Sequence, residues 1–176
     1  MATRYFTLDE AQEMLPKVRE ILGQALQLHA HLRASLARLT EAGHEISWTI
    51  LRGEEQLSGA DDGSDEDLAR ARMIYGVLRE MIARLEALGV EVKSVTSGLV
   101  DFRSWCDGER EVLLCFRLGE TEIAYFHGLE AGFSGREPIE GHDFTATPSD
   151  PERASAGAST EPPEPPSPAH NSAHSQ

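Results

Sequence analysis

The apolar positions in the first half of the chain repeat with the period of an α-helix. Residues 7–10 have the sequence of a capping box, in which threonine and glutamate side chains bind the free amides at a helix start. From residue 16 to about residue 41, one face carries a seam with spacings of three and four residues, apolar except for one histidine: Val18, Leu22, Ala25, His29, Leu32, Leu36 and Leu39. Such a seam is typical of a helix that packs against another helix. We expect Pro16 to kink or restart this helix and Gly43 to end it.

A second helical seam follows a long connection. Its apolar positions are spaced four and three residues apart: Ile74, Leu78, Met81, Leu85 and Leu88. Ser64 or Asp65 can cap its start, and Gly89 lies where a glycine commonly ends a helix. Two matching seams predict a long antiparallel helical hairpin of the coiled-coil type. Residues 44–64 between them are rich in glycine and acidic residues and lack a clear period, so we expect a mobile loop there.

After Gly89 the apolar positions change from a period of about 3.6 to a period of about 2, which is typical of strands. Three strands are expected, over residues 99–105, 112–118 and 121–127. Residues 107–108 and 119–120 form the turns, and the aspartate–glycine pair in the first turn is a strong signal for a β-hairpin. The sequence therefore predicts the α+β fold class, with a long antiparallel helical hairpin packed on a three-stranded antiparallel β-meander.

Two-residue turns fix the register of this meander. They place Asp101 opposite Leu114 in the neighbouring strand. Because successive side chains alternate between the two faces of a sheet, the face toward the helices then carries an apolar set: Val100, Phe102, Leu113, Cys115, Ala124 and Phe126. The opposite face carries a mixed set: Asp101, Arg103, Val112, Leu114, Phe116, Ile123, Tyr125 and His127.

The mixed face has three interpretations, and the residues leave all of them open. It is a solvated surface with structural ion pairs, an interface between two copies of the chain, or the floor of a ligand site. The second fits the area of its aliphatic and aromatic side chains, which exceeds what monomers usually expose. The third fits the gathering of four polar side chains toward one end of the face: Asp101, Arg103, Tyr125 and His127.

The two cysteines fall on distant parts of the predicted sheet. In the expected register, Cys106 and Cys115 are roughly 20 Å apart, beyond the reach of a disulfide. Cytosolic thiols are normally reduced, so we expect two free cysteines. Cys106 also lies about 10 Å from His127 in this register, which disfavours a cysteine–histidine pair for nucleophilic catalysis.

Residues 125–138 are the least generic segment of the chain. The glycines there lack the spacing and the lysine of a phosphate-binding loop. His127 and Glu130 could place an imidazole and a carboxylate on one metal ion, with Asp101 as the obvious third ligand. His127 and Glu130 are therefore the metal-ligand candidates, and no cofactor is indicated beyond a divalent metal at this position. The full set of ligand-binding candidates is Asp101, Arg103, Tyr125, His127, Glu130 and Arg136.

Several motifs along the chain resemble one family of bacterial proteins, the uncharacterised family catalogued as domain of unknown function 2203. They lie at residues 5–11, 14–16, 98–102, 114–120 and 125–138. The resemblance covers roughly residues 4–139 and departs at Phe116 and Phe126, where that family usually has tryptophan. It implies no activity. It supports the ligand-site interpretation, because the following residues match the family pattern: Asp101, Cys115, Glu120, His127, Gly132, Phe133, Gly135 and Arg136.

Composition divides the chain near residue 144. The segment after it holds seven prolines and no leucine, isoleucine, valine or aromatic residue. Such a segment cannot bury enough apolar surface to offset the conformational entropy that it would lose on folding. We therefore expect a single α+β domain over residues 1–144 and a disordered Pro/Ser/Glu-rich tail over residues 145–176.

The charge of the chain disfavours several classes of partner. The 176 residues carry a formal charge of −14, whereas nucleic acids and anionic membranes are bound by basic surfaces. The sequence contains no apolar run of the roughly 18 residues that a membrane span requires. Residues 1–6 also lack the apolar core of a signal peptide. We therefore expect a cytoplasmic protein without nucleic-acid or membrane partners.

Two functions stay open at this point, beside a third possibility, an adaptor that works through the proline-rich tail. The first is a small cytoplasmic binding or regulatory module that forms a homo-oligomer. A small anionic ligand suits this module, because Arg103, Arg117 and Arg136 gather in the sheet region of an otherwise acidic chain. The alternative is a metal- or anion-assisted enzyme with its site on the polar sheet face around His127. The residues alone do not decide whether the protein is an enzyme.

Overall fold

The computed structural model describes residues 3–59 and 61–149. The helices are α1 (Leu8–Glu41), α2 (Trp48–Arg52) and α3 (Asp62–Ala87). The strands and one short 3-10 helix follow in this order: β1 (Val90–Ser94), β2 (Leu99–Cys106), β3 (Arg110–Arg117), β4 (Tyr125–Gly128), η1 (Phe133–Gly135), β5 (Glu137–Pro138) and β6 (Phe144–Thr145). The predicted α+β class is confirmed. Most of the predicted tail, residues 150–176, lies outside the described residues.

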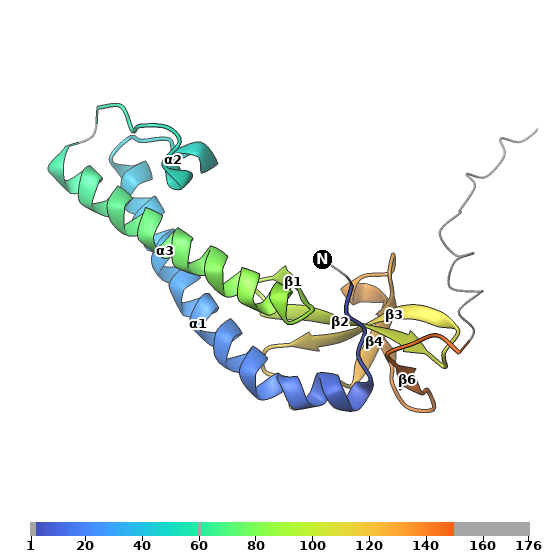
Figure 1. Cartoon of the computed structure of the whole chain (residues 1–176). Coiled ribbons are helices and arrows are strands. Elements are labelled where there is room, and N and C mark those ends of the chain that lie inside the picture. Colours follow the sequence, from blue (N-terminus) through green and yellow to red (C-terminus); the bar gives the residue numbers. More distant parts are fainter. Residues whose placement is uncertain (1–2, 60, 150–176) are drawn as a thin grey trace, which may run out of the picture.

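Helices α1 and α3 form an elongated arm. They lie side by side and run in opposite directions, with α2 at the far end of the arm (Figure 1). The two seams meet there and bury apolar side chains of all three helices: Ala25, Leu32, Leu51, Ala71, Ile74, Leu78 and Met81. The capping box at Thr7 is present, and α1 continues through Pro16 without a restart. None of the described helices has an apolar stretch long enough to cross a membrane.

Helix α2 lies within the connection for which the sequence predicted a loop. The Ser47 side chain caps its start, and Gly53 ends it in the left-handed conformation, with a φ of 77°. Ile50 and Leu51 are buried against the arm. A helix of 5 residues is too short to show a periodic pattern in the sequence.

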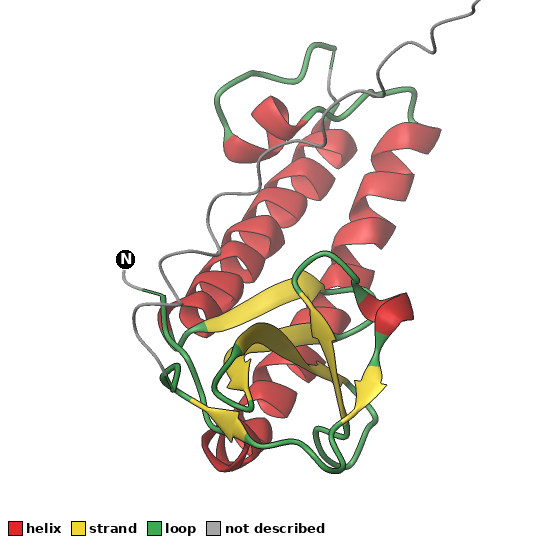
Figure 2. Ribbon diagram, turned by 90° about the vertical axis from the view of Figure 1, so that its right-hand side faces the viewer, coloured by secondary structure: helices red, strands yellow, loops and turns green. Residues whose placement is uncertain are grey.

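The sheet packs against the end of the arm where α1 begins and α3 ends (Figure 2). Its strands are antiparallel and follow the order β1-β2-β3-β4-β5, with β6 paired to β2. The predicted meander corresponds to β2, β3 and β4. The sheet also contains β1, β5 and β6, so the predicted number of strands was too small. The core between sheet and helices contains Ala11, Leu15, Val18, Leu22, Leu85, Val100, Phe102, Leu114, Phe116 and Phe126.

The turn between β2 and β3 is longer than predicted. Asp107 and Gly108 adopt the left-handed conformation expected for an aspartate–glycine turn, with φ angles of 56° and 70°. The strands then resume with Cys106 opposite Arg110, so three residues separate them instead of two. The connection from β3 to β4 also exceeds a two-residue turn, since β4 begins only at Tyr125.

These longer connections shift β3 by one residue and leave β4 in its predicted position relative to β2. Asp101 lies opposite Cys115 instead of Leu114. A slip of one residue moves every side chain of a strand to the other face of the sheet. Leu114 therefore points toward the helices. Cys115 instead lies on the opposite face with Asp101 and His127, which we call the site face.

The apolar surface that suggested an interface between two copies of the chain is buried in the structure. That surface was expected to include four side chains that the structure buries completely, at 0% exposure: Val112, Leu114, Phe116 and Ile123. All four belong to the core between sheet and helices. They therefore offer no surface to a second copy.

Candidate metal centre

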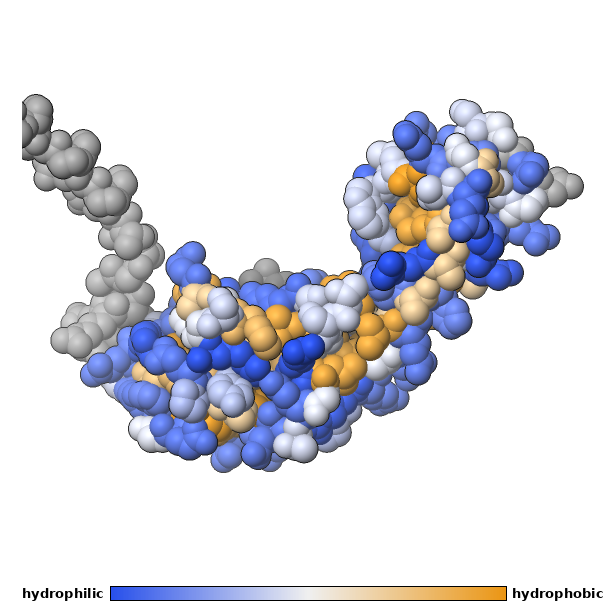
Figure 3. Space-filling view, turned by 180° about the vertical axis from the view of Figure 1, so that it is seen from behind, coloured by the Kyte–Doolittle hydropathy of each residue, from blue (hydrophilic) through white to orange (hydrophobic). Residues whose placement is uncertain are grey.

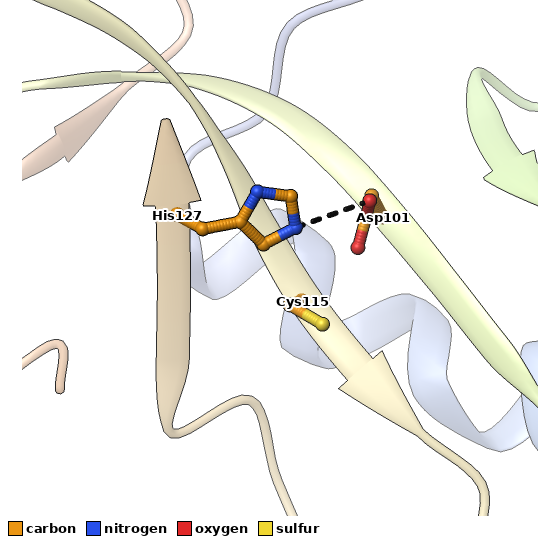
Figure 4. A group of neighbouring side chains, drawn as sticks. All are labelled: Asp101, Cys115 and His127. Atoms are coloured by element: carbon orange, nitrogen blue, oxygen red, sulfur yellow. Dashed lines mark ion pairs between the residues drawn. The ribbon is translucent and has the colours of Figure 1, made fainter. Parts of the chain in front are cut away.

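Three side chains with metal-ligating atoms meet on the site face (Figure 4). Asp101 comes from β2, Cys115 from β3 and His127 from β4, and we call them the triad. One ligand atom of each lies within 4.8 Å of the others. The register brings them together. Asp101 is the direct partner of Cys115, and His127 is the partner of Leu113, which lies two residues before Cys115 on β3 and so points to the same face. All three side chains are buried, with at most 4% of any residue exposed.

The hydrogen bond of His127 fixes which of its ring nitrogens is free. Nδ1 lies 2.8 Å from the carbonyl oxygen of Gly128. A carbonyl can only accept a hydrogen bond, so Nδ1 carries the proton and donates it. In the neutral ring, Nε2 then has a free lone pair, and it lies 3.4 Å from Oδ2 of Asp101. Histidine ligands of metals usually have this arrangement, with the second ring nitrogen bonded to a carbonyl or a carboxylate.

The triad lacks a positive charge at its centre. Nε2 of His127 faces Oδ2 of Asp101, and the buried Oδ1 of Asp101 has no hydrogen-bond partner among the described residues. Burial raises the pKa of Asp101 above its ordinary value. Burial, together with the charge of Asp101, raises the pKa of Cys115 to about 12. A divalent cation would reverse both effects, because two anionic ligands and a neutral imidazole balance its charge.

The geometry and the donor set of the triad suit a transition metal. Zinc binds imidazole and carboxylate ligands tetrahedrally at about 2.0–2.1 Å, which places two such ligand atoms about 3.3 Å apart. The distance from Nε2 of His127 to Oδ2 of Asp101 is 3.4 Å. Nitrogen, oxygen and sulfur donors together favour zinc and similar ions, whereas calcium and magnesium prefer oxygen ligands. Asp101, Cys115 and His127 could therefore hold such an ion.

A pocket of about 210 Å³ adjoins the triad. Its lining consists of Lys93, Leu99, Asp101, Leu113, His127, Leu129, Gly132 and Phe133. Nζ of Lys93 lies 3.8 Å from Oδ2 of Asp101. Three protein ligands beside a pocket are typical of a metal site that keeps one coordination position for water or a ligand.

The sequence model of one family matches most of the chain. The family is described as "Uncharacterized conserved protein (DUF2203)", and its model matches residues 4–139. The chain belongs to this family. The resemblance of the motifs to it is thereby confirmed, and the matched range of the DUF2203 chain contains the whole triad. No curated protein and no solved structure matches the chain.

Of the six ligand-binding candidates predicted from the sequence, the structure of the chain brings Asp101 and His127 into contact. Glu130 is exposed and belongs to none of the metal-ligating groups found among the described residues. Arg103 is held by two carboxylates, with Nε donating to Glu91 and Nη1 lying 2.7 Å from Glu111. Neither Glu130 nor Arg103 is therefore placed to contact an ion at the triad.

Arg136 and Tyr125 lie beside the triad without joining it. The guanidinium of Arg136 stacks against the rings of Tyr125 and Phe133, at 4.5 Å from each ring centre. Its Nη1 lies 2.9 Å from a carboxylate oxygen of Glu120, and its Nη2 donates to the carbonyl oxygen of Cys115 at 3.4 Å. Arg136 therefore holds the backbone of β3 at the position that carries the thiol.

Cys115 is the triad residue that the predicted two-residue turn placed on the wrong face of the sheet. The predicted register placed it toward the helices and so removed it from the candidates. One signal did include it, since Cys115 is among the residues that match the pattern of the DUF2203 family. Apart from that resemblance, the residues gave no reason to prefer one face for this side chain.

A second group of the same three residue types lies near the β2–β3 turn, and we call it the turn cluster. It consists of Cys106, Asp107 and His142. Oδ1 of Asp107 accepts from the amide of Asp143 at 2.8 Å. Oδ2 accepts from Nδ1 of His142 at 2.8 Å and from the thiol of Cys106 at 3.5 Å. Both carboxylate oxygens have partners, so the cluster is explained without a metal ion.

Proposed function

We propose that this DUF2203 chain is a small metal-binding module in which Asp101, Cys115 and His127 hold a divalent transition ion, with zinc as the best match. One observation carries the proposal. The free lone pair of Nε2 on His127 faces the buried carboxylate of Asp101, whose second oxygen has no partner. Buried acceptors without donors are costly. A cation between them removes that cost, and the nearby thiol of Cys115 supplies a third ligand.

The composition of the pocket supports a binding or regulatory role over a catalytic one. A hydrolytic zinc enzyme needs a general base or acid close to the metal-bound water. Beyond the triad, the pocket lining has one titratable side chain, Lys93, within the described part of the chain. Nζ of Lys93 lies 2.7 Å from Glu91, so the lysine acts as a fixed positive charge in an ion pair. A metal-assisted enzyme is the alternative, and it requires a proton-transfer group from a partner or a substrate.

The test is a zinc titration of the full chain after removal of metal by a chelator. We expect one zinc ion per chain. Cys115→Ser and His127→Gln should weaken zinc binding strongly. Cys106→Ser is the matched control, because Cys106 is also a buried free cysteine and belongs to the turn cluster. The proposal is wrong if the chain binds no zinc, or if Cys106→Ser weakens binding as much as Cys115→Ser.

We also propose that the module is cytoplasmic and self-associates. Both cysteines are free, as expected in a reducing compartment, and a thiol ligand must stay reduced. Apolar side chains reach the surface along the arm (Figure 3). On α3, Met73 and Val77 lie one turn apart and are 64% and 41% exposed, which supports a contact with a second copy. Light scattering should give the mass of an oligomer that Met73→Glu disrupts, and a monomer at high concentration would rule this contact out.

A further inference from the structure

The environment of the free coordination position indicates a class of ligand. We propose that the pocket binds a small organic carboxylate with a short apolar tail. The metal ion and Lys93 hold the carboxylate, and the apolar residues of the pocket hold the tail. This inference rests on the proposed function, because the metal ion is one of the two groups that bind the carboxylate.

Lys93 provides the second contact for the carboxylate. It is one of only two lysines in the chain, and its Nζ lies between Glu91 at 2.7 Å and Asp101 at 3.8 Å. An ammonium group has three donors; Glu91 takes one of them, and the distance to Asp101 is too long for a hydrogen bond, so N–H groups are left for a ligand. When a metal ion binds Asp101, the weaker of the two contacts is replaced, and Lys93 becomes more available. The pocket then presents two positive groups side by side.

The other walls of the pocket are apolar. They are formed by Leu99, Leu113, Leu129 and Phe133. Leu129 and Phe133 are large apolar side chains with 43% and 41% of their surface exposed. Exposed apolar groups beside a polar centre are typical of a ligand site. A bound tail would cover both side chains.

The volume limits the size of the ligand. The pocket volume of about 210 Å³ lies below the range of about 300–1,000 Å³ that is usual for sites of drug-sized ligands. A carboxylate with a phenyl or branched alkyl group fits this space, and a nucleotide does not. A phosphate ester is also disfavoured, because a dianion is best held by several charged or backbone donors, and the lining offers one ammonium group.

The experiment compares phenylacetate with phenylacetamide, which has the same shape and no charge. Calorimetry is done on the full chain loaded with zinc. We expect phenylacetate to bind at least about tenfold more tightly than the amide, because a charge-assisted hydrogen bond and a metal bond are both lost with the charge. With cobalt in place of zinc, phenylacetate should also change the visible spectrum of the metal.

Two variants separate the two parts of the pocket. Lys93→Met should weaken phenylacetate by about tenfold without weakening zinc binding, because all three metal ligands remain and the charge that competes for Asp101 is removed. Lys17→Met is the matched control, because Lys17 is the other lysine and lies exposed on α1, and it should change neither value. Phe133→Ala should reduce the preference for phenylacetate over acetate and leave acetate binding unchanged.

The outcomes distinguish this inference from the proposed function. If the chain binds no zinc, the proposed function fails and the carboxylate site fails with it. If zinc binds but phenylacetate binds no better than phenylacetamide, the carboxylate site is wrong and the metal module stands. The same holds if Lys93→Met has no more effect on phenylacetate than Lys17→Met.

Discussion

The triad and the turn cluster contain the same three residue types, yet the carboxylates of the two groups differ in their hydrogen bonds. In the turn cluster, the carboxylate of Asp107 accepts from a backbone amide, an imidazole and a thiol. The side chains of Asp107 and His142 are also 48% and 36% exposed. In the triad, the carboxylate of Asp101 is buried and one of its oxygens has no partner.

The difference shows that residue types alone do not define a metal site. A carboxylate that already has donors gains little from an ion, because the ion must first displace them. A buried carboxylate with one oxygen that has no donor keeps part of its desolvation cost until a cation or a proton arrives. The pKa values move in opposite directions for the same reason. The backbone amide of Asp143 and then His142 lower the pKa of Asp107, whereas burial raises the pKa of Asp101.

The largest expected difference between the two groups is in zinc affinity. Cys115→Ser removes a thiolate from a site with three protein ligands, so we expect zinc affinity to fall by roughly a hundredfold or more. Cys106→Ser changes the turn cluster in the same way and should leave zinc affinity unchanged. Titration against a chelator of known affinity measures both variants. Equal losses in the two variants would remove the distinction between the groups.

The second difference concerns stabilisation by zinc. An ion that binds only the folded chain at a free concentration of 100 times its Kd stabilises it by about 2.7 kcal/mol. Asp101→Asn should abolish this gain, since a neutral amide is a poor zinc ligand, and Asp107→Asn should keep it. Chemical denaturation with and without zinc measures the gain. If zinc stabilises the Asp101→Asn chain as much as the unchanged chain, the ion binds elsewhere.

A smaller effect is expected from the contact behind Cys115. Arg136 donates to the carbonyl oxygen of Cys115 and pairs with Glu120. Partners that orient a ligand commonly change metal affinity by about tenfold or somewhat more, so Arg136→Met should weaken zinc by about tenfold. Arg110→Met is the control, because Arg110 lies on the same strand beside the turn cluster. No change in Arg136→Met would show that this contact does not position the thiol.

The smallest expected effect is the pH dependence of stability without metal. The pKa of Asp101 is raised in the folded chain. Its contribution to the stability of the folded chain is therefore fully present at a pH below the ordinary pKa, and it is lost as the pH rises through the pKa of the folded chain. Asp101→Asn should therefore gain stability over the unchanged chain as the pH rises. The pKa of Asp107 is lowered in the folded chain. Its contribution to the stability of the folded chain is therefore present at a pH above the ordinary pKa, and it is lost as the pH falls through the pKa of the folded chain.

Asp107→Asn should therefore be less stable at neutral pH, with the difference disappearing in acid. Denaturant titrations from about pH 3 to about pH 7, in the presence of a chelator, measure both differences. The two variants should change in opposite directions with pH. Parallel curves for the two variants would contradict the opposite pKa shifts of the two carboxyl groups.

The two long helices and the α+β class could be predicted, because several independent sequence signals indicate each of the long helices. The seam of α1 repeats over several turns, and the capping box at Thr7 marks its start independently. Short elements carry no such signal. Helix α2 has 5 residues, and strands β5 and β6 have 2 each. Their positions follow from tertiary contacts that no local pattern shows.

The site could be predicted only in part, because β3 has no alternating pattern. Its five positions from 112 to 116 are all apolar, and all five side chains are buried, on both faces of the sheet: Val112, Leu113, Leu114, Cys115 and Phe116. Hydrophobicity therefore cannot choose between two registers that differ by one residue, and the turn alone decides. The extra residue of that turn moved Cys115 to the site face, while Asp101 and His127 kept their predicted face.

The coordination of the bound ion tests the central claim that Asp101, Cys115 and His127 form a metal centre. X-ray absorption at the zinc edge, on the zinc-loaded full chain, measures the number and type of ligand atoms. We expect one sulfur at about 2.3 Å and nitrogen and oxygen ligands at about 2.0–2.2 Å, including one from water. The sulfur should disappear in Cys115→Ser and remain in Cys106→Ser. A coordination shell without sulfur, or with a sulfur that only Cys106→Ser removes, would contradict the claim.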